Sequence, residues 1–474
     1  MQRRNIILIT VDCLRADFLG CYGNREGLTP NLDRVAKKGV LFEDVVANGS
    51  DTSSSLPSLF MSRLPNMLHP DLPSIISALK EVDYITVAFN PNVLMLLDPW
   101  LKPHLKFDFY YTFLSIERKF IAPYVEMGLS MLGNMIINLF GENSPVTRLL
   151  VDMIGVAPFP IDRPCPTADY LNEKAISWLK NHKEELEEKN FFMWLHYMDA
   201  HEPLLPPDHL LLTNITKTRI AWLNRKRRYF YQLLTETDLK LLRELYKAEV
   251  RHVDHCIGAF LDEVSRLGHD EDIVVFITAD HGELLGEHGK VGHTPDLYEE
   301  GLKIPLIILE PEVDGVRVKE PVSLLDVGPT ILDYAGAEKP ITFQGQSLMP
   351  LIHARGCYES RPIISVSRTR KHILRMAIRK GNYKLIIDMK TGERFLYDLA
   401  RDPRESVNLA GMRSDVAERL ERELHELLTM LRKTSEGTTV KEAVKIKAAR
   451  VRERIRRGRH RETGGDVGEG GPTR

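Results

Sequence analysis

Three side chains that commonly bind metal ions follow two apolar segments of this chain. The first segment, Ile6-Ile-Leu-Ile-Thr-Val, ends at Asp12, and the second, Ile273-Val-Val-Phe-Ile-Thr-Ala, ends at Asp280-His281. Short apolar runs bounded by polar residues are typical of buried strands, and ligands bind beyond the carboxyl ends of such strands. The two segments therefore predict that these three side chains meet at one point. A strand-terminal Asp is also a common cap or turn residue, so Asp12 alone leaves both interpretations open.

A cluster of hydroxyl side chains, Asp51-Thr-Ser-Ser-Ser55, precedes an apolar segment with helical character. Thr52 or a neighbouring serine is expected at the N-cap, where its oxygen accepts a hydrogen bond from a backbone N–H. The functional interpretation is a nucleophile at a helix N-terminus, where the helix dipole favours an alkoxide and an incoming anion. The segment alone does not decide between the two.

The elements that must position these residues alternate between strand and helix over much of the first 340 residues. Strands are expected at residues 5–11, 85–89, 191–196, 273–278 and 305–309, and helices at 30–39, around 173–189 and at 239–268. This alternation predicts an α/β fold with a doubly wound, mostly parallel sheet flanked by helices.

The chain is expected to divide into three parts. Residues 1–345 would form the α/β domain, with a helical insert at about 115–160, and residues 346–433 a smaller α+β subdomain with a helix from about 414 to 431. Segment 125–140 is amphipathic and nearly uncharged, which favours a helix packed on the core or a lid, with a membrane-surface or acyl-chain contact as the alternative. The tail, residues 434–474, is basic and predicted to be helical and then disordered, or else a tether to an anionic surface.

Composition narrows the class of protein. The 474 residues are 43% hydrophobic and 27% charged with a net charge of −2, which indicates a large globular protein without general affinity for nucleic acid. Five scattered cysteines form neither a disulfide framework nor a CxxC cluster, which favours a reducing compartment. No segment reaches the roughly 18 uninterrupted apolar residues that span a bilayer, and the N-terminal apolar run is too short for a signal peptide. We therefore expect a cytoplasmic protein.

Several ordered motifs resemble those of the sulfatase family, within the alkaline phosphatase superfamily. Val11-Asp-Cys-Leu-Arg-Ala-Asp17, Gly20-Cys-Tyr-Gly23 and Thr29-Pro-Asn-Leu-Asp-Arg34 are similar to the opening of that family. Thr278-Ala-Asp-His-Gly-Glu-Leu-Leu-Gly-Glu-His288 is similar to its second metal motif, and residues 325–336 and 396–409 resemble later landmarks. The likeness runs from about residue 4 to 411, so the chain is identified as a member of the family.

The resemblance implies one bound divalent cation, with Asp12, Asp280 and His281 at ligand positions and Thr52 at the nucleophile position. Many sulfatases carry two adjacent acidic residues where this chain has Asp12-Cys13. Losing that carboxylate while keeping His281 shifts the expected metal from calcium toward manganese or zinc.

The nucleophile segment departs from the family pattern. Sulfatases typically carry a Cys or Ser that is oxidised to formylglycine in a Cys/Ser-x-Pro-Ser-Arg signature, whereas this chain has Thr52-Ser-Ser-Ser-Leu56. Threonine cannot yield formylglycine, whose hydrate expels sulfate. An unmodified Thr alkoxide is the nucleophile type of the phospho-transferring branches of the superfamily, so the chemistry favours phosphate esters while the family likeness favours sulfate.

The resemblance also suggests residues that touch the substrate. His201, in Leu195-His-Tyr-Met-Asp-Ala-His-Glu-Pro, would protonate the leaving oxygen, and His293 would contact the ester anion, with Lys290 as a nearby alternative. Asn92 follows a predicted strand and would reach the anion or form a turn. Arg15 is a further substrate-binding candidate, although its guanidinium would also suit support of the metal loop or of a neighbouring carboxylate.

The leading interpretation is a metal-dependent hydrolase of sulfate or phosphate esters, including phosphodiesters, with a small anionic ester as substrate. The alternative is transfer of a phosphoethanolamine- or phosphoglycerol-type group to a lipid or sugar alcohol, which the apolar insert and the basic tail would suit. A non-catalytic anion-binding relative is a third interpretation, but it would need a damaged metal site, and Asp12, Asp280 and His281 are all present.

Overall fold

The computed structural model describes residues 3–92, 101–113, 163–211, 214–268, 272–369 and 372–432, together with a few isolated positions between 95 and 150. The predicted insert, apart from those isolated positions, and the predicted basic tail lie outside the described residues. Residue contacts place Met1–Leu424 in one compact unit, and the fold described below is that unit's.

A nine-stranded sheet forms the centre of this unit. Its strand order is β10-β2-β9-β6-β1-β5-β3-β4, with β11 paired to β2. The consecutive strands β6, β1, β5, β3 and β4 run parallel to one another. Strand β9 runs antiparallel to both of its neighbours, β6 and β2. The predicted mostly parallel sheet is therefore confirmed. The strands are β1 Asn5–Val11, β2 Val40–Val46, β3 Ile85–Phe89, β4 Phe109–Tyr111, β5 Phe191–Tyr197, β6 Ile273–Ala279, β9 Lys303–Leu309, β10 Val316–Val318 and β11 Val322–Ser323.

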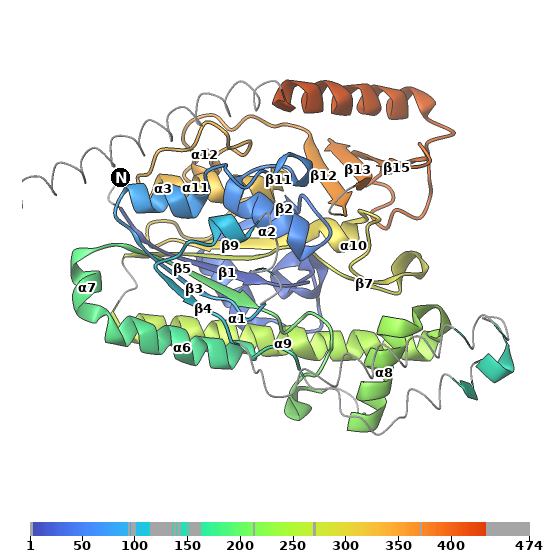
Figure 1. Cartoon of the computed structure of the whole chain (residues 1–474), viewed down its shortest axis with the longest axis horizontal. Coiled ribbons are helices and arrows are strands. Elements are labelled where there is room, and N and C mark those ends of the chain that lie inside the picture. The colour runs from blue at the N-terminus through green and yellow to red at the C-terminus, as the bar shows by residue number, and fades with distance from the viewer. Residues whose placement is uncertain are drawn as a thin grey trace, which may run out of the picture. The chain divides into compact units, whose positions relative to one another are not determined.

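Helices cover both faces of the sheet, as the doubly wound fold requires (Figure 1). One layer contains α1 (Pro30–Lys38) and α6 (Ala168–Asn181), both of which pack against α9 (Glu236–Arg266). The other contains α2 (Thr52–Met61), α3 (Ile75–Glu81) and α11 (Val327–Tyr334). The shorter helices are α7 Lys183–Glu188, α8 Lys217–Tyr229, α10 Glu299–Leu302 and α12 Met349–Ile352. Among the residues described, no helix is both long and apolar enough to cross a membrane.

The prediction of a single helix around residues 173–189 is wrong in one respect. In the structure this segment is divided into α6 and α7 at His182. The His182 ring stacks on Trp178 at 4.5 Å between centroids, and its Nδ1 lies 2.9 Å from the Trp178 carbonyl oxygen. These contacts close the last turn of α6 and hold His182 in a non-helical backbone conformation.

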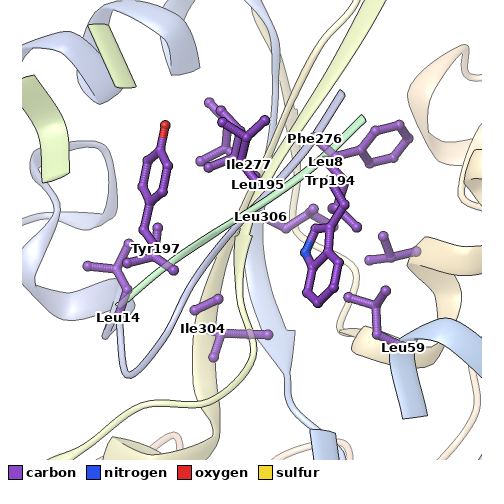
Figure 2. Close-up of a cluster of buried hydrophobic side chains, with 14 of the residues drawn as sticks. Leu8, Leu14, Leu59, Trp194, Leu195, Tyr197, Phe276, Ile277, Ile304 and Leu306 are labelled. Atoms are coloured by element: carbon purple, nitrogen blue, oxygen red, sulfur yellow. The ribbon is translucent and has the colours of Figure 1, made fainter. Parts of the chain in front are cut away.

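Every residue of β1, β5 and β6 is buried, and most of these residues are apolar, so the sheet centre is the core of the unit. Leu8 pairs in register with Trp194 on β5 and with Phe276 on β6, and Figure 2 shows these side chains gathered with Leu59 of α2. Trp194 also meets Phe60 of α2 edge-on, at 4.8 Å between ring centroids. This packing fixes where β1 and β6 end relative to the start of α2.

A second sheet of four antiparallel strands follows, as predicted for the C-terminal part. It comprises β12 Ile363–Arg368, β13 Ile373–Lys380, β14 Tyr383–Asp388 and β15 Arg394–Asp398, in that order. Asn48 joins it to the first sheet, since its Nδ2 donates to the Ile364 carbonyl oxygen and its own carbonyl oxygen accepts from the Val366 N–H. Residues 414–424 are helical, and so are residues 425–432, which belong to the second unit. The predicted domain boundaries at 345 and 433 remain predictions.

The turn after β6 depends on the absence of a side chain at Gly282. A Cβ built there would lie 2.1 Å from the Glu300 carbonyl oxygen, closer than any real contact, and the Gly282 N–H donates to the Gly301 carbonyl oxygen at 2.9 Å. The end of β6 can therefore approach the Glu300 backbone only with glycine at this position.

We expect Gly282→Ala to lower the free energy of unfolding by about 1–3 kcal/mol, because the backbone must shift to admit the methyl group. Urea denaturation of the variant measures this loss. Gly411→Ala is the matched control, since a Cβ there meets no atom within 4 Å. Equal unfolding midpoints for the two variants would contradict the close-approach argument.

Candidate metal and nucleophile site

The ends of β1 and β6 bring Asp12, Asp280 and His281 together. Val11 and Ala279 are paired in register on these parallel strands, so the residues that follow them emerge side by side. All three side chains are fully buried. His281 Nε2 lies 3.6 Å from Asp12 Oδ1 and 3.5 Å from Asp280 Oδ2. The structure thus gathers the three residues that the sequence predicts as metal ligands.

Thr52 presents its hydroxyl to the same cluster. Its Oγ1 lies 3.2 Å from Asp12 Oδ2 and 3.1 Å from His281 Nε2, at the first residue of α2. The expectation that Thr52 or a serine caps this helix is wrong, because the N-cap is Asp51, whose carboxylate accepts from the Ser54 N–H at 3.0 Å. A carboxylate suits the positive end of the helix dipole and leaves the hydroxyl of half-buried Thr52 available for chemistry.

Three buried polar atoms of the cluster lack a hydrogen-bond partner among the described residues. Within the described part of the chain, Asp12 Oδ1, Asp280 Oδ2 and His196 Nε2 have no hydrogen-bond partner. Because unpaired buried carboxylates are costly, such atoms indicate a missing positive charge. His281 Nδ1 lies 2.9 Å from the Gly282 carbonyl oxygen, which only accepts, so Nδ1 carries a proton and Nε2, once deprotonated, can bind a cation. This donor set fits a divalent cation.

The charges in the cluster are strongly coupled. Burial raises the pKa of Asp280, and the neighbouring charge of Asp12 raises it further. For Asp12, burial is outweighed by the charges of His201, His196 and His281, which hold the pKa of its carboxyl well below the usual range. For His281, burial opposes protonation, but the carboxylates of Asp280 and Asp12 outweigh it and raise the pKa to about 9. In the metal-free protein His281 is therefore protonated near neutral pH.

His201 and His293, the two histidines predicted to contact the substrate, lie beside the cluster. The His293 ring centroid is 5.5 Å from that of His281 and 5.3 Å from that of His201. His201 Nδ1 lies 2.7 Å from the Glu202 carbonyl oxygen, so Nδ1 donates and Nε2 is the atom available for proton transfer. His201 is half-buried and His293 is exposed, so both can meet a ligand entering from solvent.

The three remaining predicted residues are engaged elsewhere. Lys290 Nζ donates to Asp296 Oδ2 at 2.6 Å. Arg15 is buried, and its guanidinium donates to both carboxylate oxygens of Asp17, to the Glu283 carbonyl oxygen and to Glu287. This matches the support of the metal loop that the sequence also suggested for Arg15. The backbone N–H of Asn92 donates to Asn90 Oδ1 at 2.9 Å. Substrate binding by these three residues remains a prediction.

Two groups near the site were missed by sequence reasoning. His196 lies in β5 with Nε2 at 3.5 Å from Asp12 Oδ2, and only the register of β1 against β5 reveals that proximity. Arg227 of α8 is buried and donates to Glu283, which is also buried, while its Nε lies 3.7 Å from Glu202 Oε2. The basic sequence Arg225-Lys-Arg-Arg228 resembles an exposed helix face, so no sequence signal distinguishes Arg227.

Two protein-family models match this chain. The model of the family described as Sulfatase matches residues 4–337, and the model of the N-sulphoglucosamine sulphohydrolase C-terminal region matches residues 286–434. The multifunctional alkaline phosphatase superfamily protein PehA of Trinickia caryophylli is 26% identical, over 87% of this chain and 92% of that protein. An arylsulfatase of Clostridium perfringens is 24% identical, over 86% of this chain and 90% of its own length.

Solved structures share the fold. BT4656, in complex with its substrate D-glucosamine-2-N,6-O-disulfate, superposes with a TM-score of 0.66 at 20% identity, covering 92% of this chain and 99% of that one. The phosphonate monoester hydrolase of Agrobacterium radiobacter gives a TM-score of 0.65 at 20% identity, over 91% and 96% of the two chains. These likenesses confirm the predicted α/β architecture.

We expect the affinity for Mn²⁺ to increase with pH up to the pKa of His281, about 9, and to level off above it. The cation must displace the proton from Nε2, so one proton gives up to about a tenfold gain in affinity per pH unit. Isothermal titration at several pH values between about 6 and 9 measures the slope. His281→Asn is the control, because an amide does not titrate in this range. Equal slopes for the two proteins would contradict the assignment of that proton.

Proposed function

The chain belongs to the sulfatase family, and we propose that it is a metal-dependent ester hydrolase in which Thr52 is the nucleophile. The observation that carries the proposal is the position of Thr52 Oγ1, 3.2 Å from Asp12 Oδ2 and 3.1 Å from His281 Nε2. A threonine that served only to begin a helix would not be expected to contact two buried side chains of the metal-ligand type. The hydroxyl lies where a helix N-terminus and a cation both favour its ionised form.

In this proposal Asp12, Asp280 and His281 hold one divalent cation, and manganese or zinc suits the imidazole better than calcium does. When bound, the cation supplies positive charge that lowers the pKa of a neighbouring hydroxyl and neutralises ester oxygens. Thr52 is the first residue of α2, and the positive end of the helix dipole favours an anionic group near it. Asp12 Oδ2 is placed to accept the Thr52 proton.

The reaction then proceeds in two steps carried by side chains of this chain. Thr52 Oγ1 attacks the phosphorus or sulfur atom, forming a covalent ester as the bond to the alcohol oxygen breaks. Protonated His201 donates from Nε2 to the departing oxygen, and His293 binds the oxygens of the transferred group. Neutral His201 next removes a proton from water as the water oxygen attacks the threonyl ester, and the bond to Thr52 Oγ1 breaks. Asp12 returns the proton to Thr52 Oγ1, so that the anion is released and Thr52 and protonated His201 are restored.

Phosphate esters are the preferred substrates in this proposal. Residues 52–56 contain no cysteine, and threonine cannot form the aldehyde hydrate that expels sulfate in typical sulfatases. A threonyl phosphate is cleaved by water directly and needs no such modification. The curated relative PehA is described as multifunctional, and a structural neighbour is a phosphonate monoester hydrolase, so phosphorus esters fall within the range of similar proteins.

We expect Thr52→Ala to lower kcat at least about a thousandfold, since it removes the atom that forms the covalent bond. Hydrolysis of an aryl phosphate, a bis-aryl phosphate and an aryl sulfate, each with Mn²⁺, measures both the loss and the preferred ester. Thr52→Ser keeps the hydroxyl and is expected to retain much of the activity. Full activity of the alanine variant on the preferred ester would refute the assignment.

The role of His201 predicts a dependence on the leaving group. We expect His201→Gln to slow esters of poorly acidic alkyl alcohols by about 100- to 10,000-fold and nitrophenyl esters far less, because nitrophenolate departs without a proton. The exposed His69→Gln serves as a control. If His201→Gln slowed both ester types by the same factor, His201 would not be the general acid.

A further inference from the structure

His196 is a buried histidine with one unsatisfied ring nitrogen. It lies in β5 with a fully buried side chain, and in the part of the chain that the structure describes its Nε2 has no hydrogen-bond partner. A histidine that only filled the core would be expected to satisfy both nitrogens. The Nε2 atom instead lies 3.5 Å from Asp12 Oδ2.

The other nitrogen of His196 is held by a neighbouring strand. Thr10 is its register partner on β1, and Thr10 Oγ1 lies 2.8 Å from His196 Nδ1. Thr10 Oγ1 also accepts from Trp194 Nε1 at 2.9 Å, and its own proton can reach the Leu195 carbonyl oxygen at 3.5 Å. When the Thr10 hydroxyl donates to the Leu195 carbonyl oxygen, Thr10 Oγ1 can accept from His196 Nδ1, and in that tautomer His196 Nε2 is able to bind a cation.

The same arrangement occurs at His281, whose Nδ1 is bonded to the Gly282 carbonyl oxygen. Metal-binding histidines nearly always have their second nitrogen anchored in this way, which fixes both the tautomer and the ring orientation. The Nε2 atoms of His196, in β5, and of His281, after β6, thus both lie near the Asp12 carboxylate.

The spacing of the donor atoms suits a shared ion. Atoms of His196, Asp12 and Asp280 that could bind a metal all lie within 4.8 Å of one another. Ligands at about 2.1 Å from a cation are at most about 4.2 Å apart, so a small adjustment accommodates all three. One cation would satisfy the three atoms that lack partners among the described residues, Asp12 Oδ1, Asp280 Oδ2 and His196 Nε2.

We propose that His196 Nε2 is a fourth protein ligand of the cation, alongside Asp12, Asp280 and His281. The inference rests on the metal requirement of the proposed function. Cys13 lies at the edge of the same site, with Sγ 3.8 Å from His281 Nδ1 and a ligand atom within 4.8 Å of those of Asp12 and His281. The resulting set of two carboxylates and two imidazoles suits zinc or manganese and disfavours calcium.

Pulsed EPR of the Mn²⁺-loaded protein tests this directly by counting coordinated imidazole nitrogens. The wild type is expected to show two, and His196→Gln and His281→Gln one each. The control His252→Gln removes another buried histidine, on α9, and is expected to keep both. Metal titration should show affinity weakened at least about tenfold in His196→Gln. Thr10→Val should keep both nitrogens but bind Mn²⁺ about tenfold more weakly, because the ring loses its anchor.

The outcomes separate the inference from the proposed function. A wild-type spectrum with a single imidazole, lost only in His281→Gln, would overturn the role of His196 and leave the hydrolase proposal intact. Failure of the wild type to bind any divalent cation would overturn both. The wild-type count decides the question even if a ligand variant does not fold.

Discussion

The structure depends on the burial of two carboxylates, Asp12 and Asp280, at the ends of adjacent parallel strands. Both are fully buried, and the charge of one raises the pKa of the other. Bringing two like charges into a dry site is unfavourable unless positive charge accompanies them. The apolar sheet centre imposes this proximity, because the register of β1 and β6 is set by side chains such as Leu8 and Phe276. Core packing therefore holds the two carboxylates close together, and a bound cation would offset the repulsion between them.

The groups around Asp12 and Asp280 offset only part of the negative charge of these two carboxylates. His281 and His196 direct imidazole nitrogens at Asp12, and Thr52 adds a hydroxyl from the N-terminus of α2. Farther out, buried Arg227 joins Glu283, in the loop after β6, to the neighbourhood of Glu202, next to His201. This ion pairing connects the metal-ligand loop with the loop of the proposed general acid. The site is thus assembled by four segments far apart in the sequence, namely the ends of β1, β5 and β6 and the start of α2.

Much of this could be predicted from the sequence, because apolar runs that end in ligand-type residues define both strands and site. Asp12, Asp280, His281, Thr52, His201 and His293 were predicted and lie together. What was missed depends on register or on three-dimensional charge pairing. His196 is distinguished only by pairing with Thr10, and Arg227 only by its burial beside Glu283. The helix cap was wrongly assigned because Asp51 and Thr52 have similar capping preferences, and only the backbone conformation selects one.

The proposed reaction requires that Thr52 form the covalent bond to the transferred group. Rapid acid quenching during turnover of an aryl phosphate with Mn²⁺, followed by peptide mass spectrometry, tests it most directly. We expect a phosphate adduct on Thr52 that appears at the rate of product formation and is absent from Thr52→Ala. An adduct on Ser53, Ser54 or Ser55, or phosphate release at full rate with no adduct on any residue of this segment, would contradict it.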